Sequence, residues 1–94
     1  MKSLDAADLA AFLERQPLVV DVRSPVLFRQ GSLEGALNIP TAEIQQGQHQ
    51  LPKDRPILLV CERGIQSELA GLYLEADGYG EVYHLAGGLN ALKR

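Results

Sequence analysis

The feature that most constrains the fold of this chain is a run of four apolar residues, Ile57-Leu58-Leu59-Val60. A strand with one face in water would alternate apolar and polar residues. A short unbroken run is instead typical of a strand buried on both faces of a parallel sheet. A second run, Leu18–Val22, is rich in β-branched residues and is interrupted only by Asp21. The two runs predict inner strands of a parallel sheet.

Helical patterns alternate with these runs. Ser3–Gln16 predicts a helix that begins at an N-cap, Asp5, and ends before Pro17. After Cys61, apolar residues spaced i, i+3, i+4 and i+7 predict one face of a longer helix that ends at Gly78. These residues are Leu69, Leu72, Tyr73 and Ala76. Shorter helices and strands are predicted at Ser24-Pro25, Ala36–Ile39, Thr41–Gln46, Val82–Leu85 and after Gly87-Gly88. The alternation predicts a single α/β domain over residues 1–94, with a mainly parallel central sheet and helices on both faces.

Composition argues against several classes of function. The single cysteine among 94 residues cannot form an intramolecular disulfide, so nothing requires an oxidising compartment. The net charge is −3 with acidic and basic residues mixed, which is unlike a surface that follows nucleic-acid phosphates. No apolar segment approaches the roughly 20 residues that cross a bilayer, and no basic amphipathic helix is present. We expect a cytoplasmic protein without membrane contact, whose partner is a small molecule or another protein.

Cys61 directly follows the clearest predicted strand, and sites in parallel sheets form beyond the C-terminal ends of strands. The tight loop Glu62–Ser67 leads into the long helix, which predicts backbone N–H groups that converge on an anion. Gly64 permits the backbone angles of such a turn. A thiolate there would gain about 0.3–2 kcal/mol from the partial positive charge of the helix start. Arg63 would add to this if it turned inward, whereas Glu62 would oppose it and is expected to point to solvent.

A lone cysteine at the end of an apolar strand is also commonly an inert, buried hydrophobe. The glycine loop and the helix after Cys61 favour a reactive thiol over that interpretation. His49 and His84 are far apart in sequence and accompany only one cysteine, so no metal ligands are assigned. Asp21 and Arg23, at another strand end, are interpreted as a structural ion pair, and Arg23 is the better placed of the two to reach a substrate.

Four segments occur in the order and at the distances of one known family. Leu18–Pro25 is an apolar strand that ends in Asp-Val-Arg, and Gly31–Pro40 is similar to Gly-His-Ile-x-Gly-Ala-x-Asn-Ile-Pro. Ile57–Ser67 resembles an active-site strand with a six-residue loop, and Leu85–Gly88 resembles a Gly-Gly element before a last helix. Over nearly its whole length the chain resembles the rhodanese (thiosulfate sulfurtransferase) family in its small single-domain form.

The resemblance implies a sulfurtransferase in which Cys61 is the nucleophile and carries sulfane sulfur as a persulfide. The thiolate takes the outer sulfur of thiosulfate or a persulfide donor. A thiol, cyanide or a thioredoxin-like dithiol then removes it. The implied substrate-binding residues are Glu62, Arg63, Gly64, Ile65, Gln66 and Ser67, whose amides cradle the sulfur, and Arg23. No metal or organic cofactor is implied.

The chain departs from the family pattern at positions that bear on the donor. Gln66 stands where arginine is frequent, and an amide binds sulfonate oxygens less strongly than a guanidinium does. Because Arg63 and Arg23 are the remaining nearby cations, thiosulfate is expected to be a poor donor. Ser32 stands in place of a frequent histidine and is interpreted as structural.

Two other functions share part of the pattern. A cysteine phosphatase or arsenate reductase would hold phosphate in a similar cradle. It needs a longer loop with arginine after Cys-x5, where this chain has Ser67. The alternative from a different class is a non-catalytic rhodanese-like interaction module. Such modules often lack the cysteine that this chain retains.

Overall fold

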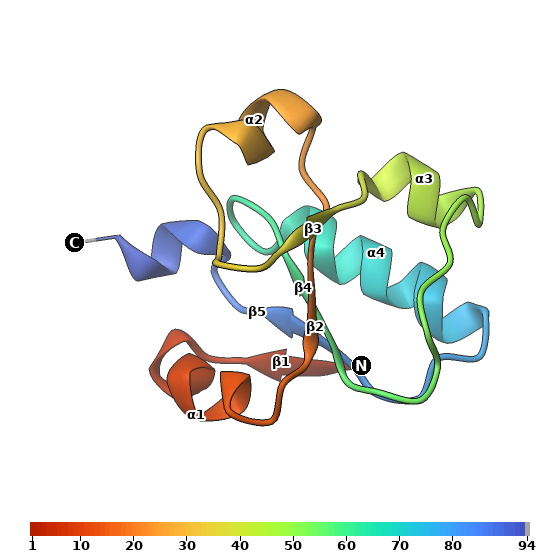
Figure 1. Cartoon of the computed structure of the whole chain (residues 1–94), viewed down its shortest axis with the longest axis horizontal. Coiled ribbons are helices and arrows are strands. Elements are labelled where there is room, and N and C mark those ends of the chain that lie inside the picture. The colour runs from red at the N-terminus through yellow and green to blue at the C-terminus, as the bar shows by residue number, and fades with distance from the viewer. Residues whose placement is uncertain (94) are drawn as a thin grey trace.

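Five parallel strands form one sheet in the computed structural model, which describes residues 1–93. The strands are β1 (Lys2–Leu4), β2 (Leu18–Asp21), β3 (Leu37–Asn38), β4 (Ile57–Val60) and β5 (Val82–Leu85). Their order across the sheet is β1-β5-β4-β2-β3, which puts the two apolar runs side by side as β2 and β4 (Figure 1). The predicted parallel sheet is therefore confirmed.

Helices cover both faces of this sheet (Figure 1). They are α1 (Leu9–Leu13), α2 (Pro25–Arg29), α3 (Thr41–Gln45), α4 (Ile65–Ala76) and the 3-10 turns η1 (Ala6–Asp8) and η2 (Leu89–Leu92). Side chains alternate along β4, so Leu58 and Val60 pack with α1, whereas Ile57, Leu59 and Cys61 pack with α3 and α4. The alternation that buries both faces of β4 thus directs Cys61 toward the helix that follows it.

The starts of α2 and α3 use different chemistry. Ser24 Oγ accepts a hydrogen bond from the N–H of Leu27 at 3.5 Å, and Pro25 occupies the first turn, as the sequence predicts. Thr41, expected to cap a helix reaching Gln46, is instead the first residue of α3, and its hydroxyl donates to the Val22 carbonyl at 3.4 Å. This bond ties the start of α3 to the end of β2.

The predicted helix Ser3–Gln16 is wrong in its first half. The residues of β1 pair with β5 as an edge strand, and Asp5 precedes the 3-10 turn η1 without a side-chain capping bond. The α-helix proper begins only at Leu9. Main-chain pairing along an open sheet edge prevails over the local helical pattern here, and such long-range pairing leaves little trace in a three-residue segment.

The predicted apolar face of the long helix is also wrong except at Tyr73, which is partly buried and packs against the core. Leu69 and Leu72 are 38% and 52% exposed. The buried residues of α4 are Ser67, Ala70, Gly71 and Leu74. Small residues on this face let the helix lie close to its neighbours, since a Cβ added at Gly71 would collide with the Met1 side chain. Gly78 follows the end of the helix with φ +93°, as predicted.

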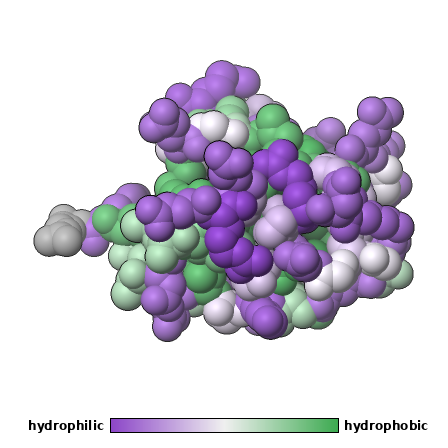
Figure 2. All heavy atoms as spheres, turned by 60° about the horizontal axis from the view of Figure 1, so that its bottom comes forward, coloured by the Kyte–Doolittle hydropathy of each residue, from purple (hydrophilic) through white to green (hydrophobic). Residues whose placement is uncertain are grey.

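Figure 2 shows a face of the molecule on which polar side chains predominate, with hydrophobic ones in small groups between them. Within residues 1–93, none of the helices combines the length and the apolar character needed to cross a membrane.

Candidate active site

Cys61 lies just beyond β4, where the chain turns sharply into α4. Gly64 makes the turn with φ +93°, a left-handed conformation that favours glycine. The turn places the N–H of Gly64 3.1 Å and the N–H of Ser67 3.3 Å from Cys61 Sγ, and both donate to the sulfur. Two main-chain dipoles point at the thiol, and the N-terminus of the 12-residue α4 adds partial positive charge at the same place.

Ser67 lies fully buried beside the sulfur and connects it to the loop. The Cys61 thiol donates to Ser67 Oγ at 3.4 Å, and this hydroxyl donates to the Gly64 carbonyl at 3.2 Å. The side chain of Ser67 therefore holds the turn that presents the Gly64 N–H, while its own N–H contacts the sulfur.

The segment after β5 supports the loop from behind. The N–H of Leu89 donates to the Cys61 carbonyl at 2.8 Å, and the N–H of Asn90 donates to the Glu62 carbonyl at 3.0 Å. Gly88 lies so close that an added Cβ would be 2.5 Å from the Cys61 carbonyl oxygen. The glycine pair before η2 thus provides both a turn and a close approach to the loop.

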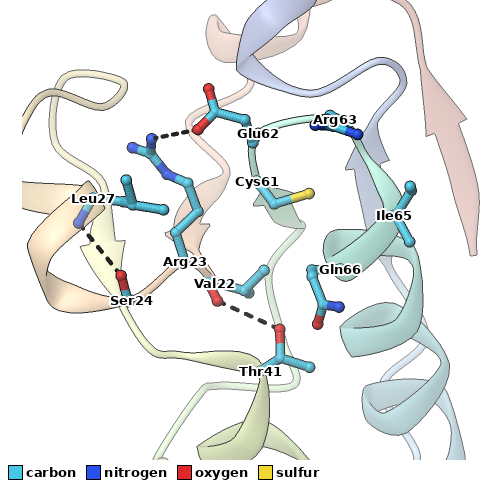
Figure 3. A pocket seen from close by; sticks show the side chains of 10 residues that line it. All are labelled: Val22, Arg23, Ser24, Leu27, Thr41, Cys61, Glu62, Arg63, Ile65 and Gln66. Carbon is cyan, nitrogen blue, oxygen red and sulfur yellow. Dashed lines mark hydrogen bonds and ion pairs between the residues drawn. The ribbon is translucent and has the colours of Figure 1, made fainter.

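A pocket of about 540 Å³ opens over the cysteine. Cys61 as a residue is only 3% exposed, but it lines this pocket and its sulfur points into it (Figure 3). The predicted site residues on the lining are Arg23, Glu62, Arg63, Ile65 and Gln66. Gly64 and Ser67 do not line the pocket and lie against the sulfur instead. The structure brings the whole predicted set together around one sulfur atom.

Arg23 is fixed by the buried carboxylate of Asp21. Its Nε lies 3.0 and 3.1 Å from the two carboxylate oxygens, and its Nη2 donates to Asp21 at 2.8 Å and to the Gly31 carbonyl at 2.6 Å. The Ser32 hydroxyl donates to the same carboxylate at 2.7 Å. The predicted structural ion pair is thus present, and Ser32 belongs to it.

This network changes the acid–base properties of both partners. Burial of Asp21 raises the pKa of its carboxyl, but hydrogen bonds from Arg23 and Ser32 outweigh that effect and hold the pKa below its ordinary value. The hydrogen bond with Asp21 raises the pKa of Arg23, and Glu62 adds to that rise. Both groups are therefore charged over the physiological range.

Glu62 does not simply point to solvent, which corrects the sequence prediction. Its side chain turns away from the sulfur toward Arg23 (Figure 3). Its carboxylate lies 3.7 Å from Arg23 Nη1 and 3.5 Å from Lys93 Nζ, and 40% of the side chain stays exposed. Attraction to two cations, which the sequence pattern does not encode, sets this orientation. Arg63 and Gln66 are exposed at the pocket, and among residues 1–93 Arg63 has no ion-pair partner.

Sequence reasoning missed Val22, Ser24, Leu27 and Thr41 on the other side of the pocket. Val22 follows β2, the neighbour of β4, so the rule that sites gather at strand ends could have found it. The positions of Leu27 and Thr41 depend on how the chain after β2 folds back over the sheet, which residue spacing does not determine.

No three His, Cys, Asp or Glu side chains in the described part of the chain form a group that could hold a metal ion. His49 packs near Tyr79 with ring centroids 6.0 Å apart, and His84 is a buried residue of β5 with Nε2 3.9 Å from Glu68.

Fold and site together define a small parallel α/β domain built around a cysteine in a strand–loop–helix cradle. A family model described as the rhodanese-like domain matches residues 5–94, and the chain belongs to this family.

Known proteins agree with this assignment. A sulfurtransferase of Allochromatium vinosum is 39% identical over 77 residues, which cover 82% of this chain and 72% of that protein. The thiosulfate sulfurtransferase GlpE of Shewanella oneidensis is 34% identical over 91 residues, with coverages of 96% and 90%. A crystal structure of a rhodanese homolog from the extremely thermophilic bacterium Thermus thermophilus matches with a TM-score of 0.82 at 45% identity, covering 94% of this chain and 96% of that one. The resemblance and fold class predicted from the sequence are confirmed.

Proposed function

We propose that this protein is a sulfurtransferase that carries sulfane sulfur as a persulfide on Cys61. The observation that carries the proposal is the pair of N–H groups, from Gly64 and Ser67, that donate to the sulfur beneath an open pocket. Hydrogen bonds to a charged partner contribute about 1.5–3 kcal/mol, more than those to a neutral one, so the pair favours the thiolate. The names of the sulfurtransferase relatives support the same class of reaction.

The reaction has two displacements at sulfur. The Cys61 thiolate attacks the outer sulfur of the donor, a new S–S bond forms, and the donor's S–S bond breaks. The electron pair of that bond leaves with the rest of the donor, as sulfite when the donor is thiosulfate. A thiol or cyanide then attacks the outer persulfide sulfur and releases the thiolate. The protein needs no metal or organic cofactor for either displacement.

The loop residues supply the binding groups in this proposal. The amides of Glu62–Ser67 hold the anionic sulfur that extends from Cys61, and the side chains of Arg63, Gln66 and Arg23 contribute to the pocket that receives the donor. The start of α4 stabilises negative charge on sulfur in both displacements.

Intact mass spectrometry tests the proposal directly, because the chain has a single cysteine. After incubation with thiosulfate, a glutathione persulfide or an organic thiosulfonate, we expect a gain of one sulfur atom, which cyanide or dithiothreitol removes. Cys61→Ser should gain none. If no donor loads the parent protein, it is not a sulfurtransferase. Cys61-dependent hydrolysis of an aryl phosphate would favour a phosphatase, and partner capture that survives Cys61→Ser would favour an interaction module.

A further inference from the structure

The pocket contains two arginines, but the charge of one is already matched. Arg23 directs Nε and Nη2 at Asp21, and its Nη1 lies 3.7 Å from the Glu62 carboxylate. Its side chain is only 9% exposed. Asp21 and the Gly31 carbonyl thus accept the hydrogen bonds of Nε and Nη2, and the Glu62 carboxylate offsets charge near Nη1. A donor anion in the pocket would find little unmatched charge on this residue.

The other polar groups of the pocket do not supply the unmatched positive charge that Arg23 lacks. Ser24, Thr41 and Gln66 are neutral, and the Thr41 hydroxyl already donates to the carbonyl at the end of β2. Arg63 is exposed at the mouth, where water and salt screen its charge. A dianion that enters the pocket loses its hydration shell and gains only the loop N–H groups and one screened cation. These contacts do not compensate for the desolvation of a doubly charged group.

The pocket is larger than a small inorganic donor requires, and part of its wall is apolar. Leu27 of α2 and Ile65 of α4 lie on opposite sides of Cys61 (Figure 3), and they are 36% and 68% exposed. The volume of about 540 Å³ falls within the range typical of sites for organic molecules. An organic substituent could cover Leu27 and Ile65 while its sulfur reaches the cysteine.

We propose that the preferred donor is an organic persulfide or thiosulfonate that carries an apolar substituent and a single negative charge, in preference to the dianion thiosulfate. This specificity rests on the proposed sulfurtransferase function. With a thiosulfonate, the thiolate attacks the outer sulfur, the S–S bond breaks, and the electron pair leaves on a sulfinate. With a persulfide, the pair leaves on a thiolate. Neither reaction needs an oxidant or a reductant.

Three donors separate charge from apolar contact: thiosulfate, methanethiosulfonate and benzenethiosulfonate. The rate of Cys61 persulfide formation is measured by quenched intact mass and divided by the rate for a simple thiol, which removes differences in intrinsic reactivity. We expect benzenethiosulfonate to exceed methanethiosulfonate by roughly tenfold or more, the scale of a few methylene groups in an apolar pocket. Thiosulfate should be the slowest.

Variants locate the contacts. Leu27→Ala and Ile65→Ala should reduce the normalised rate with benzenethiosulfonate by roughly three- to tenfold and reduce the rate with methanethiosulfonate less. Leu13→Ala is the matched control, because Leu13 is 37% exposed but lies on α1 and does not line the pocket, and it should change neither rate. Gln66→Arg should raise the rate with thiosulfate, since it adds an uncommitted guanidinium.

The outcomes distinguish this inference from the function on which it rests. If no donor loads Cys61, both are wrong. If thiosulfate loads fastest after normalisation, or Leu27→Ala and Ile65→Ala leave the preference for benzenethiosulfonate intact, the specificity is overturned while the sulfurtransferase function stands.

Discussion

Gly88 is the position at which one added methyl group should separate the active-site loop from its support. Its backbone, at φ +64° and ψ −162°, lies in a region almost confined to glycine, where another residue costs about 1–3 kcal/mol. A Cβ would also lie 2.5 Å from the Cys61 carbonyl oxygen, well inside the 3.4 Å at which ordinary van der Waals contact begins. Because the obstructing atoms are main chain, no side-chain rotation can relieve the overlap.

Relief requires the loop and η2 to move apart, which would stretch the bonds from Leu89 to the Cys61 carbonyl and from Asn90 to the Glu62 carbonyl. Overpacking typically costs about 1–3 kcal/mol, so overlap and backbone strain together should destabilise Gly88→Ala by about 2–6 kcal/mol. In a domain of this size each kcal/mol lowers Tm by about 4–8 °C, and we expect a fall of at least roughly 8 °C.

Gly47→Ala is the matched control. Gly47 also has a positive φ, +71°, but nothing lies within 4 Å of an added Cβ, so the variant has left-handed strain without overlap. Thermal unfolding by circular dichroism measures stability, and quenched intact mass measures sulfur loading of Cys61. Gly88→Ala should lose more stability than Gly47→Ala and load several-fold more slowly. Equal Tm values with unchanged loading would refute the view that close contact with η2 sets the shape of the loop.

Three further changes test other parts of the structure. Asp21 has a lowered pKa, so its contribution to the free energy of unfolding is present above the ordinary aspartate range and is lost as pH falls through the lowered value. Asp21→Asn should lower the free energy of unfolding by about 3–5 kcal/mol at neutral pH and make urea unfolding depend less on acid pH. An acid dependence as steep as the parent's would contradict this assignment. Ser67→Ala should slow iodoacetamide alkylation of the cysteine by roughly tenfold, because the variant loses the hydroxyl bond to the Gly64 carbonyl that holds the Gly64 N–H against the sulfur; an unchanged rate would show that the main chain suffices. Leu74→Ala should cost about 2–5 kcal/mol, whereas Leu72→Ala should stay within about 0.5 kcal/mol, and denaturant titrations that reversed this order would contradict the observed face of α4.

The inner strands could be predicted because burial on both faces leaves a continuous apolar run. β1 could not, since Lys2 and Ser3 are exposed and only Leu4 is buried, and its pairing with β5 joins opposite ends of the chain. A segment of three residues is too short to show the alternation of a strand. It is therefore assigned to the helix that the following residues predict.

The long helix shows a different limit. Its predicted apolar face and its buried face have the same spacing, i, i+3, i+4 and i+7. Hydropathy selects the face with Leu69 and Leu72, but the structure buries the face with Ala70 and Gly71. Close approach of the helix to the sheet and to Met1 requires small side chains, and a hydropathy pattern does not register that requirement.

The site was predictable where it depends on one local segment. Cys61 and its loop follow from a strand, a glycine and a helix start in sequence. The orientation of Glu62 and the apolar side of the pocket were not predictable, because they depend on Arg23, Lys93 and Leu27, which the fold brings in from other segments.

The pairing that leaves little unmatched positive charge on Arg23 also stabilises the fold. To free the Nε and Nη2 groups of Arg23 for a donor anion, Asp21 would have to be removed. Breaking a buried pair costs about 3–5 kcal/mol, a large part of the stability of a small domain. Gln66 is an exposed residue in the first turn of α4, where a substitution typically changes stability by no more than about 0.5 kcal/mol. A change of charge at position 66 should therefore lower the stability of the fold little, whereas a change at the Asp21–Arg23 pair should lower it greatly. Donor specificity should be adjustable at Gln66 while the Asp21–Arg23 pair is retained.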